Sequence, residues 1–130
     1  MKPVEQLHKI REAINTRTIT PDELSRAVVS LHSLLCTIGE EVANLKKAYE
    51  LAYWERKRQW TYYKHLAEGD ATAREKQANE SINELKLKEV EAEYAYNYLK
   101  NIRDDYSQYA MGLQSRLNVL RDERIKTYKE

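Results

Sequence analysis

The sequence has no phenylalanine, only three glycines and two prolines, and a single cysteine among its 130 residues. Glycine and proline supply most tight turns, so their scarcity argues against a sheet protein with many short connections. Charged residues make up 33 % of the chain, which is typical of long solvated helices. We therefore predict an all-α chain, and a length of 130 residues allows one domain, residues 1–130, with a modest core.

Cysteine is scarce in the sequence, and long apolar runs are absent. Cys36 has no second cysteine with which to form an internal disulfide, a metal pair or a redox pair. It follows the apolar Leu35, and we interpret it as a packed, unreactive thiol. His32 follows Leu31, and we interpret it as a partly buried packing residue. No apolar run approaches the ~20 residues that cross a bilayer, and the first residues lack a signal-peptide core. We expect a soluble, intracellular protein without a membrane contact.

Charge of one sign is also missing, because 22 basic and 21 acidic residues leave a net charge of +1. A polyanionic partner must therefore be met by a local cluster of cations and not by the field of the whole chain. The three histidines, His8, His32 and His65, are far apart, and neither a paired-histidine metal motif nor a glycine-rich phosphate loop occurs. We expect no catalytic residues, no metal ligands and no cofactor, and hence a protein that is not an enzyme.

What the sequence does contain is helical periodicity. Pro3 suits the first turn of a short helix over residues 3–15. Thr20, Pro21 and Glu23 form the start signal of a long helix over residues 21–67. Its apolar positions alternate at steps of four and three, the seam of a helix that packs along another helix. They are Leu24, Val28, Leu31, Leu35, Ile38, Val42, Leu45, Tyr49 and Ala52.

A second long helix is predicted over residues 82–127, after a turn over residues 68–80 that is either a helical turn or a loose loop. One stripe of this helix carries Leu85, Ala92, Ala95, Leu99, Ile102, Tyr106, Tyr109, Leu113, Leu117 and Leu120. We predict a long antiparallel, coiled-coil-like hairpin in which residue numbers of facing positions sum to about 150. Gly39 would then face residues 110–112, either because small residues let the backbones approach closely or because glycine is merely tolerated there.

The second long helix has a further apolar face, formed by Leu87, Val90, Tyr94 and Tyr98. One hairpin leaves this face partly uncovered, so either the short amino-terminal helix or another subunit covers it. The chain has ten tyrosines, whose rings bury area while their hydroxyl groups stay hydrated. We therefore expect the protein to self-associate into a homo-oligomer.

The seam of the first long helix ends where Arg56 and Gln59 take the next two seam positions. Residues 54–64 contain four cations, Arg56, Lys57, Arg58 and Lys64, and four rings, Trp54, Trp60, Tyr62 and Tyr63. Cations that contact phosphates and rings that stack on unpaired bases are the two ingredients of sequence-tolerant single-strand binding. These eight residues are our candidate DNA-binding residues. The alternative is that Trp60 and Tyr63, three residues apart, close the core end of the hairpin.

Four features together resemble phage recombination mediators of the UvsY type. They are the length near 130 residues, the basic segment that runs from Lys57 into Tyr62 and Tyr63, the turn at Gly69 and Asp70, and spaced aromatic residues over 96–109 of the closing helix. The resemblance covers residues 42–125 at the level of pattern. In that family a Lys-x-Arg pair precedes the two tyrosines. Lys57 matches the lysine, whereas Gln59 holds the arginine position and Arg58 lies one place earlier, a turn of about 100° on a helix.

The resemblance implies a ring-forming accessory protein that binds single-stranded DNA. Such proteins help to displace the single-strand-binding protein and to load a RecA-like recombinase, without hydrolysing anything themselves. If phage-encoded, the protein would be in the host cell cytoplasm. The competing hypothesis is a coiled-coil protein-binding module, such as a phage inhibitor or scaffold, that has no contact with nucleic acid.

Overall fold

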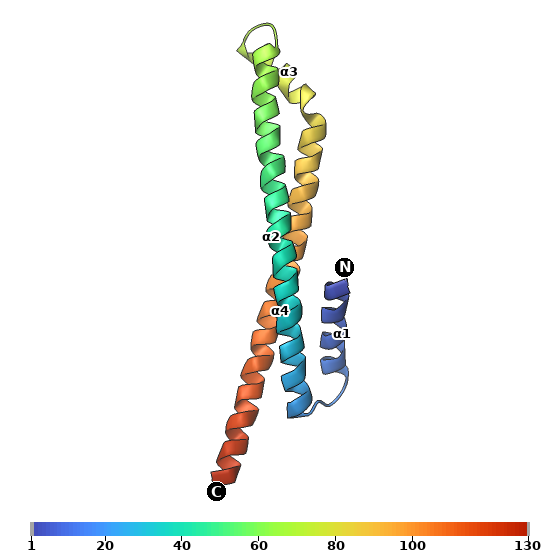
Figure 1. Ribbon diagram of the computed structural model, residues 1–130, viewed down its shortest axis with the longest axis vertical. Helices are drawn as coiled ribbons and strands as arrows, with labels where there is room; N and C mark the ends of the chain where they lie inside the picture. The colour runs from blue at the N-terminus through green and yellow to red at the C-terminus, as the bar shows by residue number, and fades with distance from the viewer. Residues whose placement is uncertain (1, 130) are drawn as a thin grey trace. The chain divides into compact units, whose positions relative to one another are not determined.

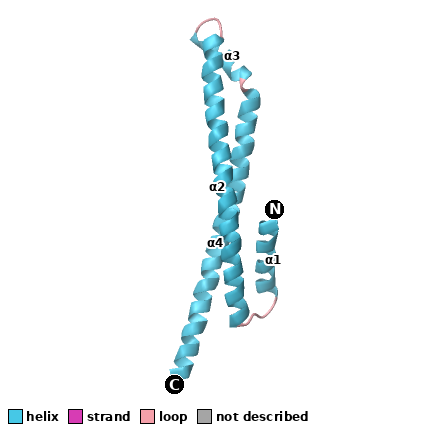
Figure 2. Cartoon of the chain, viewed as in Figure 1, coloured by secondary structure: helices cyan, strands magenta, loops and turns pink. Residues whose placement is uncertain are grey.

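Four helices make up the chain in the computed structural model, which describes the backbone of residues 2–129 and the side chains of residues 2–123. They are α1 (Lys2–Thr16), α2 (Pro21–Leu66), α3 (Ala71–Ser81) and α4 (Asn83–Lys129) (Figure 1). The described residues contain no strand (Figure 2). The prediction of an all-α chain is therefore confirmed, and α1, α2 and α4 end within two residues of their predicted bounds.

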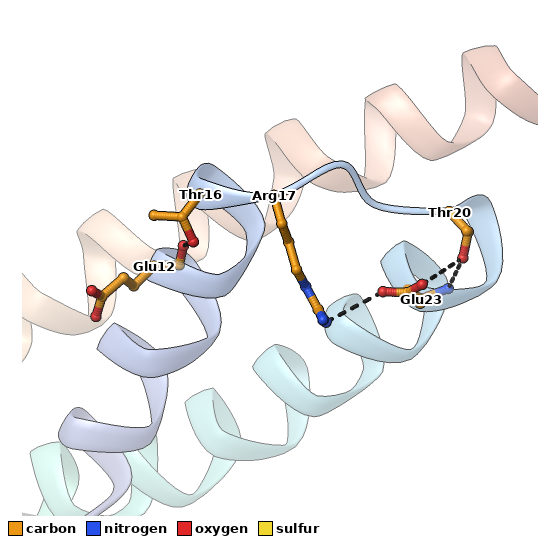
Figure 3. Close-up of polar contacts among 5 residues, drawn as sticks. All are labelled: Glu12, Thr16, Arg17, Thr20 and Glu23. Atoms are coloured by element: carbon orange, nitrogen blue, oxygen red, sulfur yellow. Dashed lines mark hydrogen bonds and ion pairs between the residues drawn. The ribbon is translucent and has the colours of Figure 1, made fainter.

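The start of α2 uses the residues that the sequence signal indicates (Figure 3). The hydroxyl oxygen of Thr20 accepts a hydrogen bond from the Glu23 N–H at 3.2 Å, and the hydroxyl donates to the Glu23 carboxylate, also at 3.2 Å. The same carboxylate lies 3.3 Å from the Arg17 guanidinium. Thr20 thus satisfies one of the free N–H groups at the helix start. In return, the Glu23 carboxylate accepts a hydrogen bond from the Thr20 side chain and not from the Thr20 backbone N–H.

The region over residues 68–80 was predicted as a turn, either a helical turn or a loose loop. In the structure it contains the helix α3, from Ala71 to Ser81. Gly69 has a φ of 107°, a conformation that L side chains rarely adopt. Asp70 then caps α3, because its carboxylate accepts a hydrogen bond from the Ala73 N–H at 2.8 Å. The Gln77 side chain donates to the Glu68 carbonyl at 3.0 Å. These contacts hold the chain reversal before α3.

The chain divides into two compact units. The first unit joins Met1–Glu41 with Leu99–Glu130. In it, His8 of α1 contacts Tyr106 of α4, and Ile10 of α1 lines a hollow together with Val29 and Leu34 of α2. Leu7 of α1 is fully buried. The core of this unit contains the predicted seam positions Leu24, Val28, Leu31, Leu35 and Ile38 from α2 with Leu99, Tyr106, Leu113 and Leu117 from α4, all buried. The predicted seam is confirmed here.

The second unit is Val42–Tyr98. Its fully buried residues are Ala78 and Ile82, while the α2 seam continues with half-buried Leu45, Tyr49 and Ala52. Within this unit α2 and α4 run antiparallel, because the Tyr49 ring lies against Tyr96 of α4 and Arg56, further along α2, pairs with Glu89. Both pairs have residue numbers that sum to 145. The register is therefore about five residues away from the one predicted.

Gly39 also departs from the predicted register, in the first unit. A Cβ atom at Gly39 would meet the Arg103 side chain at 3.4 Å, and one at Gly112 would meet nothing within 4 Å. Gly39 thus lies opposite Arg103 and not opposite residues 110–112. The structure favours two tolerated glycines over a close backbone approach.

Cys36 and His32 are both exposed, so their interpretation as packed residues was wrong. Each is one residue beyond a seam leucine, and one residue turns a helical side chain by about 100°, away from the core. Among the described residues, no helix has a stretch that is apolar and uncharged enough to cross a bilayer.

Candidate nucleic-acid interface

The outer face of α2 in the second unit, defined here as Trp54, Lys57, Arg58 and Tyr62, collects half of the candidate residues. The Trp54 and Tyr62 side chains are 64 % and 57 % exposed, and the Arg58 side chain is 73 % exposed. Eight residues of helix separate the two rings by about 12 Å along the axis, with Arg58 midway between them. Two flat rings and a guanidinium are therefore presented to solvent on one side of one helix.

Lys57 extends this face on one side. Its ammonium nitrogen lies 4.8 Å from the centre of the Tyr53 ring and 5.9 Å from that of Trp54, so the charge rests on aromatic rings. In the described part of the chain, no carboxylate forms an ion pair with Lys57. Its charge is thus available to an incoming anion.

Arg58 has a competitor for any anion, because its guanidinium donates to the Glu55 carboxylate at 2.7 Å. Gln59 donates to the other oxygen of the same carboxylate at 3.2 Å. These hydrogen bonds, first that of Gln59 and then that of Arg58, lower the pKa of Glu55 below its ordinary value. Both partners of the Arg58 to Glu55 pair are solvent-exposed, and exposed pairs of this kind contribute less than about 1 kcal/mol.

Arg56 points away from the outer face. Two of its guanidinium nitrogens donate to the Glu89 carboxylate of α4, and the two side chains are only 24 % and 14 % exposed. The sequence predicted Arg56 as a DNA-binding cation, but the structure places it between two helices of the second unit. Its seam position explains this location, since a seam side chain faces the partner helix.

Trp60 and Lys64 lie on the side of α2 that meets α3. The Trp60 N–H donates to the Asn79 side chain at 3.0 Å, and the indole is half-buried. The Lys64 ammonium lies 4.9 Å from the centre of the Trp60 ring and 3.6 Å from the Glu75 carboxylate. Trp60 therefore contacts α3 and is not on the outer face, but neither Trp60 nor Tyr63 belongs to the buried core.

Tyr63, the last of the eight candidates, lies at the border of the outer face. It is 36 % exposed, and its ring makes an edge contact with Tyr62 at 5.6 Å between centroids. It supports the Tyr62 ring more than it offers a face of its own.

A hollow of about 500 Å³ lies where the end of α2 meets α3. It is lined by Arg58, Thr61, Tyr62, Lys64, His65 and Arg74. No carboxylate is among these lining residues. Sequence reasoning missed Arg74, because residues 68–80 were predicted as a turn and only a helix places Arg74 beside α2. The signal that could have found it is Asp70, whose side chain is a good helix cap.

Elsewhere, the described residues offer little chemistry beyond packing. In the first unit a ring nitrogen of His8 is hydrogen-bonded to the Tyr106 hydroxyl, and the Arg11 guanidinium lies over Tyr106 and Tyr109. Burial raises the pKa of the Tyr109 phenol. No group of three or more His, Cys, Asp or Glu side chains among the described residues is placed to hold a metal ion.

No protein-family model matches the chain, and no curated protein or solved structure matches it either. Fold alone does not determine function, so the chemistry of the exposed side chains is what indicates a function for this chain.

Proposed function

We propose that the protein binds single-stranded DNA through the outer face of α2 and acts as a non-enzymatic recombination accessory. The observation that carries this proposal is the exposure of Trp54 and Tyr62 on one side of a helix, with the Arg58 guanidinium between them. Exposed aromatic rings flanked by cations suit a strand whose bases are unpaired, because every base has a face that can stack and every linkage carries a phosphate.

The energies indicate which groups matter most. Stacking contributes about 1 to 3 kcal/mol per base, whereas an exposed charge pair contributes less than about 1 kcal/mol. The rings at Trp54 and Tyr62 therefore provide the short-range affinity. Lys57 and Arg58 attract the phosphates and make binding dependent on salt. A net charge of +1 gives no general attraction to a polyanion, so this local cluster has to supply it.

The more specific role rests on the resemblance of residues 42–125 to phage recombination mediators. In this role the DNA-bound protein helps to replace a single-strand-binding protein with a RecA-like recombinase. In a homo-oligomer, including a ring, several outer faces would engage one strand at once. A modest affinity at each copy would then become useful through avidity.

The test is a titration of a fluorescently labelled single-stranded oligonucleotide over a range of salt concentrations. Trp54→Ala and Tyr62→Ala should each weaken binding by about 5- to 150-fold, the equivalent of one lost stacking contact. Lys57→Ala with Arg58→Ala should reduce the slope of log affinity against log salt by about 1.4, at about 0.7 per cation.

The matched control removes two exposed cations from the first unit, Arg26→Ala with Arg121→Ala, and should leave the slope nearly unchanged. Absent or salt-insensitive binding by the unmodified protein would contradict the proposal. Equal losses in the control pair and the Lys57 and Arg58 pair would do so too.

A second candidate function is favoured by one specific observation on α4. In the second unit Leu87, Val90, Tyr94 and Tyr98 are 64 %, 60 %, 71 % and 56 % exposed. The rings of Tyr94 and Tyr98 stack with centroids 6.1 Å apart. An exposed apolar face of this kind indicates a protein contact. On this alternative the chain is a coiled-coil protein-binding module that does not bind the oligonucleotide at all.

A further inference from the structure

We propose that the hollow between α2 and α3 is a phosphate-binding site. Under the proposed function, the ligand of this hollow is a phosphodiester of the same DNA strand whose base stacks on Tyr62. This choice of ligand rests on the proposed function. The hollow is lined by Arg58, Thr61, Tyr62, Lys64, His65 and Arg74.

The composition of the lining fits phosphate. Three side chains are cations, two carry hydroxyl groups and one is an imidazole, and none is a carboxylate. Phosphate oxygens accept hydrogen bonds from all of these donors, and the planar guanidinium of arginine can bind two phosphate oxygens at once. The hollow between α1 and α2 in the first unit offers a contrast. Among its lining residues only Lys9 is a cation, and the rest are apolar or neutral polar.

Two of the three cations of the hollow have exposed carboxylate partners, since Arg58 pairs with Glu55 at 2.7 Å and Lys64 with Glu75. Arg74 and His65 form no ion pair with any side chain in the described part of the chain. The Lys64 ammonium lies 3.6 Å from Glu75, and both side chains are exposed to water. A phosphate that reached Arg74 and Lys64 would therefore replace one exposed, loosely held carboxylate contact, which contributes little.

The hollow also continues the outer face. Arg58 and Tyr62 belong to both, so the cationic track runs from Trp54 along α2 and ends at Arg74 on α3. Trp54 and His65 are eleven residues apart, which is about 16 Å of helix. A strand stacked on Trp54 and Tyr62 would thus carry its next phosphate toward the hollow. The site requires α3, and Arg74 is the side chain through which α3 contributes a cation.

The experiment compares Arg74→Gln with Lys76→Gln in the full chain. Both substitutions remove one exposed cation from α3, but only Arg74 lines the hollow. For a labelled single-stranded oligonucleotide, Arg74→Gln should reduce the slope of log affinity against log salt by about 0.7, and weaken binding about fivefold or more at low salt. Lys76→Gln should change affinity by less than about twofold. Circular dichroism checks that both variants keep their helix content.

A second probe, sodium tripolyphosphate, tests the hollow without DNA. It should shift the NMR signals of the His65 ring in the unmodified protein and in Lys76→Gln, and shift them much less in Arg74→Gln. Binding of tripolyphosphate without binding of the oligonucleotide would retain the phosphate site and overturn the proposed function. Equal oligonucleotide binding by the two variants, together with equal tripolyphosphate shifts, would overturn the phosphate site and leave the proposed function standing.

Discussion

The Arg56 guanidinium on α2 is hydrogen-bonded to the Glu89 carboxylate on α4, and this pair joins two helices of the second unit. Both side chains are largely withdrawn from water, at 24 % and 14 % exposure. Removal of one partner leaves the other charge poorly hydrated and without a counter-ion.

Glu89→Ala should therefore lower the free energy of unfolding by about 1.5 to 3 kcal/mol, the range for a hydrogen bond to a charged group. Urea denaturation followed by circular dichroism measures this loss. Arg58→Ala is the control, since it removes a cation whose pair with Glu55 is exposed, and it should cost less than about 1 kcal/mol. Equal losses in the two variants would mean that Arg56 has no structural role.

The pKa of Glu55 offers a second prediction. It is lowered first by the hydrogen bond from Gln59 and then by that from Arg58. A carboxyl group with a lowered pKa in the folded state stabilises the fold at neutral pH and loses this contribution as the pH falls through the folded pKa. Gln59→Ala removes the largest cause, so the pKa of Glu55 should rise toward its ordinary value. An NMR titration of the Glu55 side-chain carboxyl carbon measures it, and an unmoved midpoint would contradict the assignment.

Glu55 also competes with DNA for Arg58 under the proposed function. Glu55→Gln removes the negative charge beside Arg58 and keeps a side chain of similar shape. We expect a rise in oligonucleotide affinity of about two- to fivefold at low salt, the equivalent of one weak surface ion pair released. Glu50→Gln, an exposed substitution on α2 without an ion pair to Arg58, provides the comparison. Unchanged affinity in Glu55→Gln would remove Arg58 from the DNA contact.

Helical periodicity determines which features of this fold could be predicted from the sequence. Periodicity shows which side of a helix is buried, so the seam from Leu24 to Val42 and the matching stripe of α4 were predictable. It does not fix the register between two helices. The observed register is about five residues from the predicted one, and for that reason the pairing of Arg56 with Glu89 was not foreseen.

A related reason explains why only four of the eight candidate residues lie on the outer face of α2. Trp54 and Trp60 have the same chemistry, and only the packing of α3 distinguishes them, because the Asn79 side chain occupies the Trp60 N–H. With residues 68–80 predicted as a turn, the sequence provided no partner for Trp60 and no place for Arg74. The interpretation of Cys36 and His32 as packed residues was wrong for a different reason, because neighbours in sequence are not neighbours on a helix surface.

The glycines provide a prediction with an internal control. Gly112 lies inside α4, and an added Cβ atom there would meet nothing within 4 Å. Gly112→Ala should raise the free energy of unfolding by up to about 1 kcal/mol, the helix preference of alanine over glycine. Gly69→Ala should lower it, because Gly69 has a φ of 107° and its Cβ atom would lie 3.1 Å from that of Ala73. Thermal unfolding of both variants gives the two signs, and a destabilising Gly112→Ala would indicate a contact at that position.

Self-association is the last prediction, and it tests the exposed face of α4. Leu87, Val90, Tyr94 and Tyr98 recur at steps of three and four on one side of the helix, all more than half exposed. The side chains of α1 contact Tyr106 and Tyr109 within the first unit. A second copy that presents the same face could bury four apolar side chains without bringing like charges into the centre of the contact.

Light scattering should therefore give the unmodified protein a mass of several chains, and Tyr94→Ser with Tyr98→Ser should reduce it to that of one chain. The control, Met111→Ser with Val119→Ser, removes two side chains of 62 % and 55 % exposure from the part of α4 in the first unit, and should leave the mass unchanged. Avidity depends on this association, so the tyrosine variant should also bind a long oligonucleotide much more weakly and a short one about as well. A single-chain mass for the unmodified protein would remove the oligomer from the proposal, and the outer face of α2 would then have to bind DNA by single-site affinity alone.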